Sequence, residues 1–182
     1  MKTGILAVGT HTNSGWALAL AILFVAVIVA LAGCDPLALD KLKPGQSTEA
    51  DVRDAMGTPE MIWDEGQGVR TFEYNRQPAG HVNYMLTLGA DGKLQAIRQV
   101  LTEAEFAKVQ PGMHYDQVRR MLGKPAKDVW YPLKREHHVD WRYLKTPTDS
   151  AMFTVVLDAN RIVLRSATGV DMDEEYRSGG RR

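Results

Sequence analysis

The sequence predicts an α+β fold in which two consecutive ααβββ units each pack their helices on an antiparallel three-stranded meander. Three observations support it. The chain repeats itself once, Pro-Gly and Gly-x-Pro pairs bracket short helical patterns, and runs of alternating apolar and polar residues follow. A chain in which helices are followed by a run of strands favours a fold whose helices pack on one face of an antiparallel sheet. We expect a first unit over residues 34–100, a second over 101–168 and a disordered charged tail over 169–182.

The duplication consists of matched segments at nearly constant spacing. The matched pairs are 44–59 with 111–125, 72–74 with 141–143, and 85–88 with 154–157. The last two pairs share an offset of 69 residues (141 minus 72, and 154 minus 85), whereas the first needs one extra residue in the first copy. Agreement in both order and spacing indicates an internal repeat.

Helix signals open the second copy. Thr102 and Glu105 have the spacing of a capping box at the start of a helix over 103–109. Pro111 ends this helix because proline disfavours helical geometry in the residue before it. A second helix over 116–122 places its apolar residues on one face, at spacings of three and four.

The first copy carries the corresponding helix signals. Asp35 is expected to cap a helix whose first residue is Pro36, a position that proline favours. Thr48 or Ser47 is expected to cap the next helix, which ends at Gly57.

Strands follow from alternation and turn chemistry. They are expected at 71–74, 82–88 and 94–100 in the first copy and at 139–143, 152–157 and 162–166 in the second. Asp91-Gly92 supplies the positive φ of one hairpin turn, and Asn160 is expected to supply that of the other. The segments around Trp63 and Trp130 are weaker candidates for an extra edge strand.

Cys34 is the only cysteine of the chain, and its position indicates lipid attachment. It closes the tetrapeptide Leu-Ala-Gly-Cys, directly after an apolar run over residues 16–31. An apolar core followed by small residues is typical of a secretory signal peptide. The tetrapeptide looks like a bacterial lipobox, where the thiol receives diacylglycerol, the chain is cut before the cysteine, and the new amino group is acylated. We expect residues 1–33 to be a lipoprotein signal peptide and Cys34 to be the lipidation site.

Two alternatives concern the membrane. The run 16–31 approaches the roughly 17–25 residues that span a bilayer, so an uncleaved transmembrane anchor competes with the lipoprotein. The periplasmic face of the outer membrane is the first expected location. Asp35 directly follows Cys34, however, and resembles the enterobacterial signal for retention in the inner membrane. The periplasmic face of the inner membrane is therefore the alternative.

Composition limits the partners. The chain has 22 basic and 22 acidic side chains, and Lys2 is the only charged residue in the first 33, so the mature chain has a net charge near −1. A nearly neutral chain lacks the basic footprint of a nucleic-acid-binding protein. With Cys34 lipidated no disulfide can form, and packing alone must stabilise the fold.

No side-chain pattern predicts catalysis. The sequence has no nucleophile elbow and no glycine-rich phosphate loop. His137 and His138 are adjacent, so in a strand their rings point to opposite faces and do not converge on a metal. The four carboxylates within 171–175 could weakly attract a hard cation, but a solvated tail explains them better. We expect no enzyme activity, no cofactor, no metal and no small-molecule substrate.

Aromatic residues and arginines at matched positions have two interpretations each. The aromatic residues are Trp63, Phe72, Tyr74, Trp130, Trp141 and Tyr143. Core packing explains them best, and an exposed binding face is the alternative, since Trp and Tyr anchor interfaces. Arg53 and Arg119 occupy matched helical positions, where a solvated face explains them better than contact with a partner or phospholipid.

These motifs together resemble those of the BamE-like (SmpA/OmlA) lipoprotein family, here as a tandem pair covering nearly all of residues 36–168. The residues that carry the resemblance are Pro44-Gly45, Val52-Arg53, Gly57 with Pro59 and Phe72 with Tyr74 in the first copy, and Pro111-Gly112, Val118-Arg119, Gly123 with Pro125 and Trp141 with Tyr143 in the second. The chain departs from the single-domain members of the family in having two copies and almost no linker after the lipobox cysteine.

The resemblance implies a periplasm-facing lipoprotein that acts as an accessory scaffold in the assembly and insertion of β-barrel proteins into the outer membrane. Its partners would be proteins of the β-barrel assembly machinery, and its lipid, palmitate included, would hold it to the membrane. The partner surface is unknown. Tandem copies of a related fold also occur in proteins that inhibit β-lactamases, so the fold does not settle the function. The alternative is a lipid-anchored binding or inhibitory module for a periplasmic enzyme.

Overall fold

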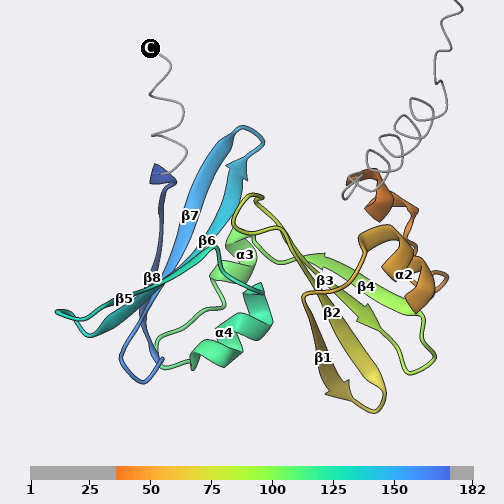
Figure 1. The fold of residues 1–182 in the computed structure, drawn as a ribbon, viewed down its shortest axis with the longest axis horizontal. Coiled ribbons are helices and arrows are strands. Elements are labelled where there is room, and N and C mark those ends of the chain that lie inside the picture. Colours follow the sequence, from red (N-terminus) through yellow and green to blue (C-terminus); the bar gives the residue numbers. More distant parts are fainter. Residues whose placement is uncertain (1–35, 173–182) are drawn as a thin grey trace, which may run out of the picture.

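The computed structural model describes residues 36–172 (Figure 1). The elements of the first half are η1 (Pro36–Lys41), α2 (Glu49–Met56), β1 (Met61–Gly66), β2 (Val69–Asn75), β3 (Asn83–Leu88) and β4 (Leu94–Gln99). Those of the second half are α3 (Glu103–Phe106), α4 (Tyr115–Leu122), β5 (Lys127–Tyr131), β6 (Glu136–Thr146), β7 (Asp149–Leu157) and β8 (Val163–Val170). The predicted roles of Cys34 and Asp35, and of the apolar run before them, lie outside the described residues and stay predictions.

Each half contains one four-stranded antiparallel sheet, in the order β1-β2-β3-β4 or β5-β6-β7-β8. The prediction of two ααβββ units is therefore wrong. Ile62 of β1 pairs with Phe72, and Trp130 of β5 pairs with His137, so both strands belong fully to their sheets. Every residue of β5 is exposed and none of β1 is buried. Neither strand therefore has the alternating burial that reveals a strand in a sequence.

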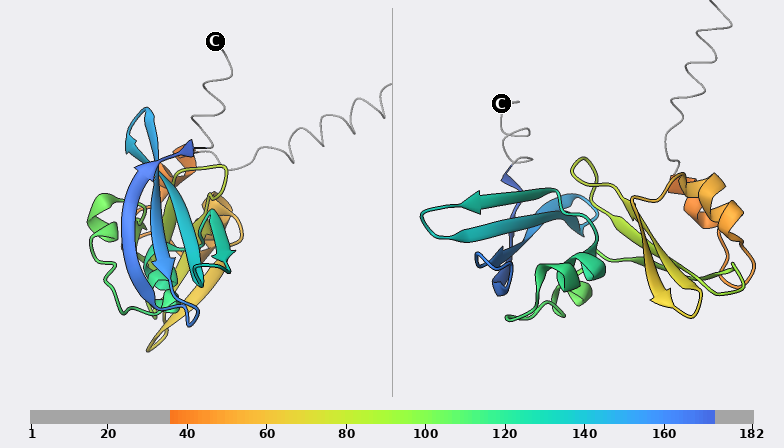
Figure 2. Two further views of the ribbon diagram at one scale, coloured as in Figure 1. Left: turned by 90° about the vertical axis from the view of Figure 1, so that its left-hand side faces the viewer. Right: turned by 60° about the horizontal axis from the view of Figure 1, so that its bottom comes forward.

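The sheets and helices alternate in four layers (Figures 1 and 2). η1 and α2 cover one face of the first sheet, and α3 and α4 lie between the other face and the second sheet. A first core joins Val52 and Met56 of α2 to Phe72, Leu86 and Leu88 of the sheet. Because the helices are short, this burial contributes more to their stability than helix propensity does.

A second core contains residues of both halves. Met85 of the first sheet packs in one cluster with Val118 and Leu122 of α4 and with Trp141 and Phe153 of the second sheet. Both faces of the first sheet are thus covered by helices, whereas α3 and α4 cover one face of the second. The shared core makes the two halves one packing unit.

The helix starts follow the capping residues of the sequence. Thr48 caps α2 in a capping box, since Asp51 N donates to Thr48 Oγ1 at 3.3 Å and Thr48 N donates to Asp51 Oδ2 at 2.8 Å. Ser47, the alternative cap, instead accepts a hydrogen bond from Lys43 N at 2.9 Å. Thr102 caps α3, and its Oγ1 accepts from Glu105 N at 3.3 Å.

Two local predictions are wrong in detail. The helix expected over 103–109 ends at Phe106, because the chain tightens there into turn bonds such as Val109 N to Phe106 O at 3.0 Å. In the hairpin between β7 and β8, the residue with positive φ is Arg161 (64°) and not Asn160. Asp158 Oδ1 instead receives Asn160 N at 2.8 Å and fixes the turn.

The same backbone bonds recur in both halves. Gly45 N donates to Leu94 O at 2.7 Å, and Gly112 N donates to Val163 O at 2.8 Å. Both bonds tie the segment before the second helix to the last strand of the sheet. Leu94 and Val163 are 69 positions apart (163 minus 94), the offset that relates the two copies in the sequence.

Glu73 is buried at the seam between the halves, with no exposed surface. Its carboxylate accepts hydrogen bonds from the Arg119 guanidinium of α4, from Lys124 N at 2.8 Å and from Trp63 Nε1 at 3.3 Å. The interpretation of Arg119 as a solvated residue is wrong, because its side chain neutralises a buried carboxylate distant in the sequence. Arg53, its counterpart in the first half, lies near the surface and pairs with Glu49 at 2.9 Å.

Asn83 and Gln77 complete the seam. Asn83 Nδ2 donates to Leu122 O at 2.8 Å and to Lys124 O at 3.1 Å, which satisfies carbonyls at the end of α4. Gln77 Nε2 donates to Arg142 O at 2.8 Å. These polar contacts fix the register of the second half on the first sheet.

The end of the described chain differs from the expected tail. Gly169 and Val170 belong to β8, and Asp171 is 1% exposed. The expectation of a solvated Asp171 is therefore wrong. Within residues 36–172 no helix has the length and apolar character to cross a bilayer.

Candidate protein-binding surface

Large apolar side chains are exposed together on the hairpin of β5 and β6. Val129, Trp130 and Tyr131 are 40%, 41% and 43% exposed, and Leu133 in the turn is 101% exposed. We call these four residues the hairpin surface. The hairpin extends away from the layers of the molecule (Figures 1 and 2). Exposed apolar side chains gathered on one hairpin, on both of its faces and in its turn, mark an interaction site more often than scattered single residues do.

The rings of the hairpin surface are held in place by neighbouring histidines. Trp130 packs on His137 with ring centroids 4.7 Å apart, and Tyr131 packs on His138 at 4.5 Å. Adjacent residues of a strand point to opposite faces, so the hairpin presents one aromatic–histidine pair on each face. Rings already held in one orientation lose less conformational entropy on binding.

A polar network supports the pair on the helix side of the sheet. Asp128 Oδ1 lies 3.1 Å from His137 Nδ1, and Asp128 Oδ2 accepts from Arg161 Nη1 at 2.7 Å. The Arg161 guanidinium lies 3.8 Å from the centroid of the Tyr115 ring in α4. This network connects the base of the hairpin to the helix layer.

A second network supports the pair on the other face. Glu136 accepts from Arg165 Nη1 at 2.9 Å and lies 3.1 Å from His138 Nε2. Hydrogen bonding to Arg165, and then to His138, lowers the pKa of the Glu136 carboxyl to about 2. Glu136 therefore stays ionised over the ordinary pH range and orients the ring on which Tyr131 packs.

The core interpretation of the repeated aromatic residues is right for four of the six. Phe72, Tyr74, Trp141 and Tyr143 are each at most 2% exposed. The interpretation is wrong for Trp130, because its strand forms the edge of the second sheet. Trp63 is half-buried at the seam, where the Arg119 and Arg120 guanidinium groups lie 5.7 and 5.2 Å from its ring centroid.

The sequence predicted a candidate edge strand around Trp130, which is β5, but it gave no binding role to Val129, Tyr131 or Leu133. Their signal was a run of apolar residues without alternation between two turn signals, at 129–133. Such a run fits a strand buried on both faces as well as an exposed edge. Only the position of α4 shows that no helix covers this end of the sheet.

His137 and His138 lie beside the hairpin surface and do not converge on a common metal position. His137 and His138 are bonded to separate carboxylates, and among residues 36–172 no three His, Cys, Asp or Glu side chains are grouped to bind a metal. The carboxylates of 173–175 lie outside the described residues.

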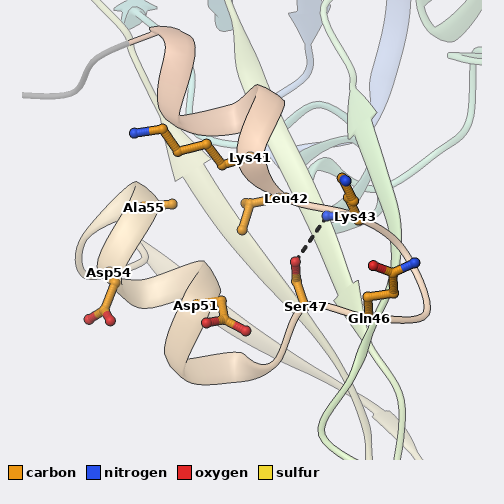
Figure 3. A pocket seen from close by; sticks show the side chains of 8 residues that line it. All are labelled: Lys41, Leu42, Lys43, Gln46, Ser47, Asp51, Asp54 and Ala55. Carbon is orange, nitrogen blue, oxygen red and sulfur yellow. Dashed lines mark hydrogen bonds between the residues drawn. The ribbon is translucent and has the colours of Figure 1, made fainter.

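A cleft of about 590 Å³ lies between η1 and α2 (Figure 3). Its lining residues are Lys41, Leu42, Lys43, Gln46, Ser47, Asp51, Asp54 and Ala55. Ser47 Oγ is bonded to Lys43 N and Asp51 to the Thr48 cap, so these polar groups serve the local fold. The lining contains no nucleophile beside a base, which acyl-transfer chemistry requires.

The comparisons with known proteins found distant structural likenesses. No family model and no curated protein matches the chain. Among solved structures, YjgB of Bacillus subtilis, a DUF4309 family protein, is 18% identical with a TM-score of 0.30. The match covers 76% of this chain and 88% of the YjgB chain. A second match is a Streptococcus mutans protein described as a putative beta-lactamase inhibitor protein, 11% identical with a TM-score of 0.29. This match covers 74% of this chain and 97% of the Streptococcus mutans chain. At these TM-scores neither likeness carries an argument about this protein.

The BamE-like resemblance is corrected by these findings. No family model matches, and each half has a four-stranded sheet where three strands were expected. The motifs behind the resemblance, such as Pro44-Gly45 and Gly57 with Pro59, are turn and helix-end signals that many folds share. The β-barrel assembly machinery as partner, and a role in outer-membrane protein assembly, lose their basis with it.

Proposed function

We propose that this protein is a lipid-anchored, non-catalytic module that binds a periplasmic enzyme through the hairpin surface. The observation that carries the proposal is the gathering of Val129, Trp130, Tyr131 and Leu133 on one protruding hairpin, all at least 40% exposed. Trp and Tyr are the residues that most often dominate the binding energy of protein interfaces. Rings held by packing on His137 and His138 fit such a role.

The shape of the surface supports an enzyme as the partner class. The hairpin extends away from the layers of the molecule, and a protruding apolar element can enter a concave, mostly apolar cleft (Figure 1). Enzyme active sites are the commonest clefts of that kind, so a hairpin that fills one is suited to inhibition. Lys134 and Arg135 follow Leu133 in the exposed turn and add positive charge at the rim.

The anchorage belongs to the same proposal. Lipidation of Cys34 would hold the module at the periplasmic face of the outer membrane, or of the inner membrane if Asp35 acts as a retention signal. An anchored binder meets membrane-proximal enzymes at a raised effective concentration, so moderate affinity suffices.

Co-purification from detergent-solubilised membranes tests the proposal. We compare the tagged wild type with Trp130→Ala/Tyr131→Ala and with a control, Met61→Ala/Ile62→Ala, whose side chains are both 42% exposed on β1. If each hairpin aromatic contributes about 2 kcal/mol, the hairpin variant binds about a thousandfold more weakly. Wild type and control should recover one enzyme that the hairpin variant does not. Equal recovery by all three proteins would contradict the hairpin surface, and a recovered partner without enzymatic activity would contradict the partner class.

A further inference from the structure

The edges of the two sheets are the places where a strand of another protein can pair with this fold. An edge strand leaves every second backbone N–H and C=O group unpaired on its outer side. Natural proteins protect such edges with bulges, charges or covering segments. The edge strands of the described chain are β1, β4, β5 and β8, and they differ in this protection.

The edges at β4 and β8 are partly covered by the segments that precede α2 and α4. Leu94 N of β4 donates to Ser47 O at 2.8 Å, and Leu94 O accepts from Gly45 N at 2.7 Å. Val163 N of β8 donates to Met113 O at 2.8 Å. Both ladders also contain a register shift, which interrupts regular pairing along the edge. These two edges are therefore protected twice.

The edge at β1 is protected by side chains of the second half. Arg120 Nη2 of α4 donates to Asp64 O at 3.3 Å and pairs with Glu65 at the same distance. Lys124 Nζ pairs with Glu60, just before β1, at 2.7 Å. The ladder of β1 and β2 also shifts register after Asp64. A further strand would have to displace these contacts.

The edge at β5 has neither a bulge nor a covering segment. Its register with β6 holds over all five residues without a shift, and every one of them is exposed. Within residues 36–172, the β5 backbone forms backbone–backbone hydrogen bonds only with β6 and within its own turn. Lys127 and Asp128 place charges at its start. Val129, Trp130 and Tyr131 then form a regular apolar edge.

The apolar side chains of this edge lie on both faces of the sheet. Val129 and Tyr131 point to one face and Trp130 to the other, because side chains alternate along a strand. A partner that lay flat on the sheet would cover one of these two sets. An extended segment paired beside β5 places its own side chains alternately on both faces and so contacts all three residues. The exposure on both faces therefore favours an added strand.

The turn after β5 adds a requirement for charge. Lys134 and Arg135 are exposed, and no ion pair among residues 36–172 includes them. An acidic side chain at the end of the added segment nearest the turn complements these cations.

We propose that the partner enzyme contributes an extended segment that pairs with the edge of β5 as a fifth strand of the second sheet. The side chains opposite Val129, Trp130 and Tyr131 are β-branched or aromatic, and an acidic residue lies beside the turn. Main-chain hydrogen bonds hold the segment, and its alternate side chains give specificity. The inference rests on the proposed function, because it names the way in which the hairpin surface binds.

Selected peptides test the added strand. Random peptides of about nine residues are selected on the full purified chain in detergent, and those that also bind Trp130→Ala/Tyr131→Ala are removed. The best peptide is synthesised with N-methyl groups on one or the other alternate set of backbone nitrogens, which leaves its side chains unchanged. In an added strand one set faces β5 and the other faces solvent. We expect one methylation to weaken binding at least about tenfold and the other to change it less than about threefold.

Amide exchange locates the bound peptide. Alternate amides of residues 127–131 should exchange about tenfold or more slowly with the unmodified peptide bound than in the free protein, because they gain hydrogen bonds. The matched control is β1, whose amides at 61–66 should exchange at an unchanged rate. Protection of β5 that rises with protein concentration without any peptide would assign the edge to a second copy and overturn the proposal.

Failure of the added strand is distinguishable from failure of the proposed function. Equal effects of the two methylations, or no peptide that separates the wild type from the hairpin variant, would overturn the added strand. An enzyme recovered by co-purification would then leave the hairpin surface as a side-chain interface. Alternating sensitivity to methylation with no enzyme recovered would support strand addition and contradict the enzyme as the partner class.

Discussion

Replacing Arg119 by methionine should destabilise the protein far more than an ordinary surface substitution. Glu73 has no exposed surface and the Arg119 side chain is 14% exposed, so the pair lies in a desolvated seam. Removing one partner of a buried ion pair costs about 3–5 kcal/mol, because the other charge stays buried without its counterion. Lys124 N and Trp63 Nε1 remain as donors to Glu73 and offset part of the loss. We therefore expect about 3 kcal/mol.

Arg53→Met is the matched control. Arg53 occupies the same place on α2, but its pair with Glu49 is largely exposed, with 39% and 29% of the two side chains accessible. Exposed helical pairs of this kind contribute about 0.3–0.5 kcal/mol. Equilibrium unfolding in urea measures both variants, and with m near 1–3 kcal/mol/M the Arg119 variant should shift its midpoint by about 1–3 M.

A double variant separates the buried charge from lost packing. Adding Glu73→Gln to Arg119→Met removes the uncompensated carboxylate, so the double variant should be more stable than Arg119→Met alone. Equal free energies of unfolding for Arg53→Met and Arg119→Met, or no recovery in the double variant, would refute the assignment of Glu73 as the buried charge of the seam.

Three further predictions use matched positions or a single titration. Gly57→Ala and Gly123→Ala both strain a φ near +80°, at about 1–3 kcal/mol, but a Cβ at Gly123 would lie 2.9 Å from an amide nitrogen of the seam, whereas nothing lies within 4 Å at Gly57. Thermal unfolding should give Gly123→Ala a lower Tm than Gly57→Ala. The reverse order would contradict the close packing of Gly123 against the first sheet. Trp141→Ala should cost about 3–5 kcal/mol and Trp130→Ala about 0.5 kcal/mol or less, because Trp141 is fully buried and Trp130 is 41% exposed; similar costs in urea would disprove the surface position of Trp130. The folded-state pKa of Glu136 is lowered from 4.5 to about 2, so its stabilising contribution is present above pH 4.5 and is lost as the pH falls through about 2. Glu136→Gln should therefore show a smaller fall in Tm between pH 4.5 and 2 than the wild type, and an identical fall would argue against the Arg165 contact.

The strands and caps that local chemistry determines could be predicted from the sequence. Segment 82–88 became β3 (Asn83–Leu88), and Thr48 caps α2, because alternation and a capping box each act over a few residues. The fourth strand of each sheet, β1 or β5, was only a weaker candidate in the sequence. β1 and β5 carry no buried face, so their membership in the sheets depends on ladder bonds to neighbours.

The seam and the hairpin surface escaped prediction for a different reason. Arg119 has the local pattern of a solvated helical residue, and its partner Glu73 lies 46 positions earlier in the sequence, on β2 of the first sheet. Trp130 occupies a repeat position equivalent to a half-buried tryptophan, yet its environment depends on where α4 ends. Comparing the two copies position by position gives the one early signal, because Glu73 matches Arg142 and a charge reversal at matched core positions indicates different neighbours.

Site-specific photo-crosslinking from the hairpin tests the central claim most directly. A photoreactive side chain replaces Leu133 in the turn, and in a control strain it replaces Asp54, which is also exposed but lies on α2. Crosslinking in living cells, followed by mass spectrometry, identifies what touches each position. We predict one abundant adduct with a periplasmic enzyme from position 133 and no such adduct from position 54. The absence of any protein adduct at 133, or the same adducts from both positions, would contradict binding through the hairpin surface.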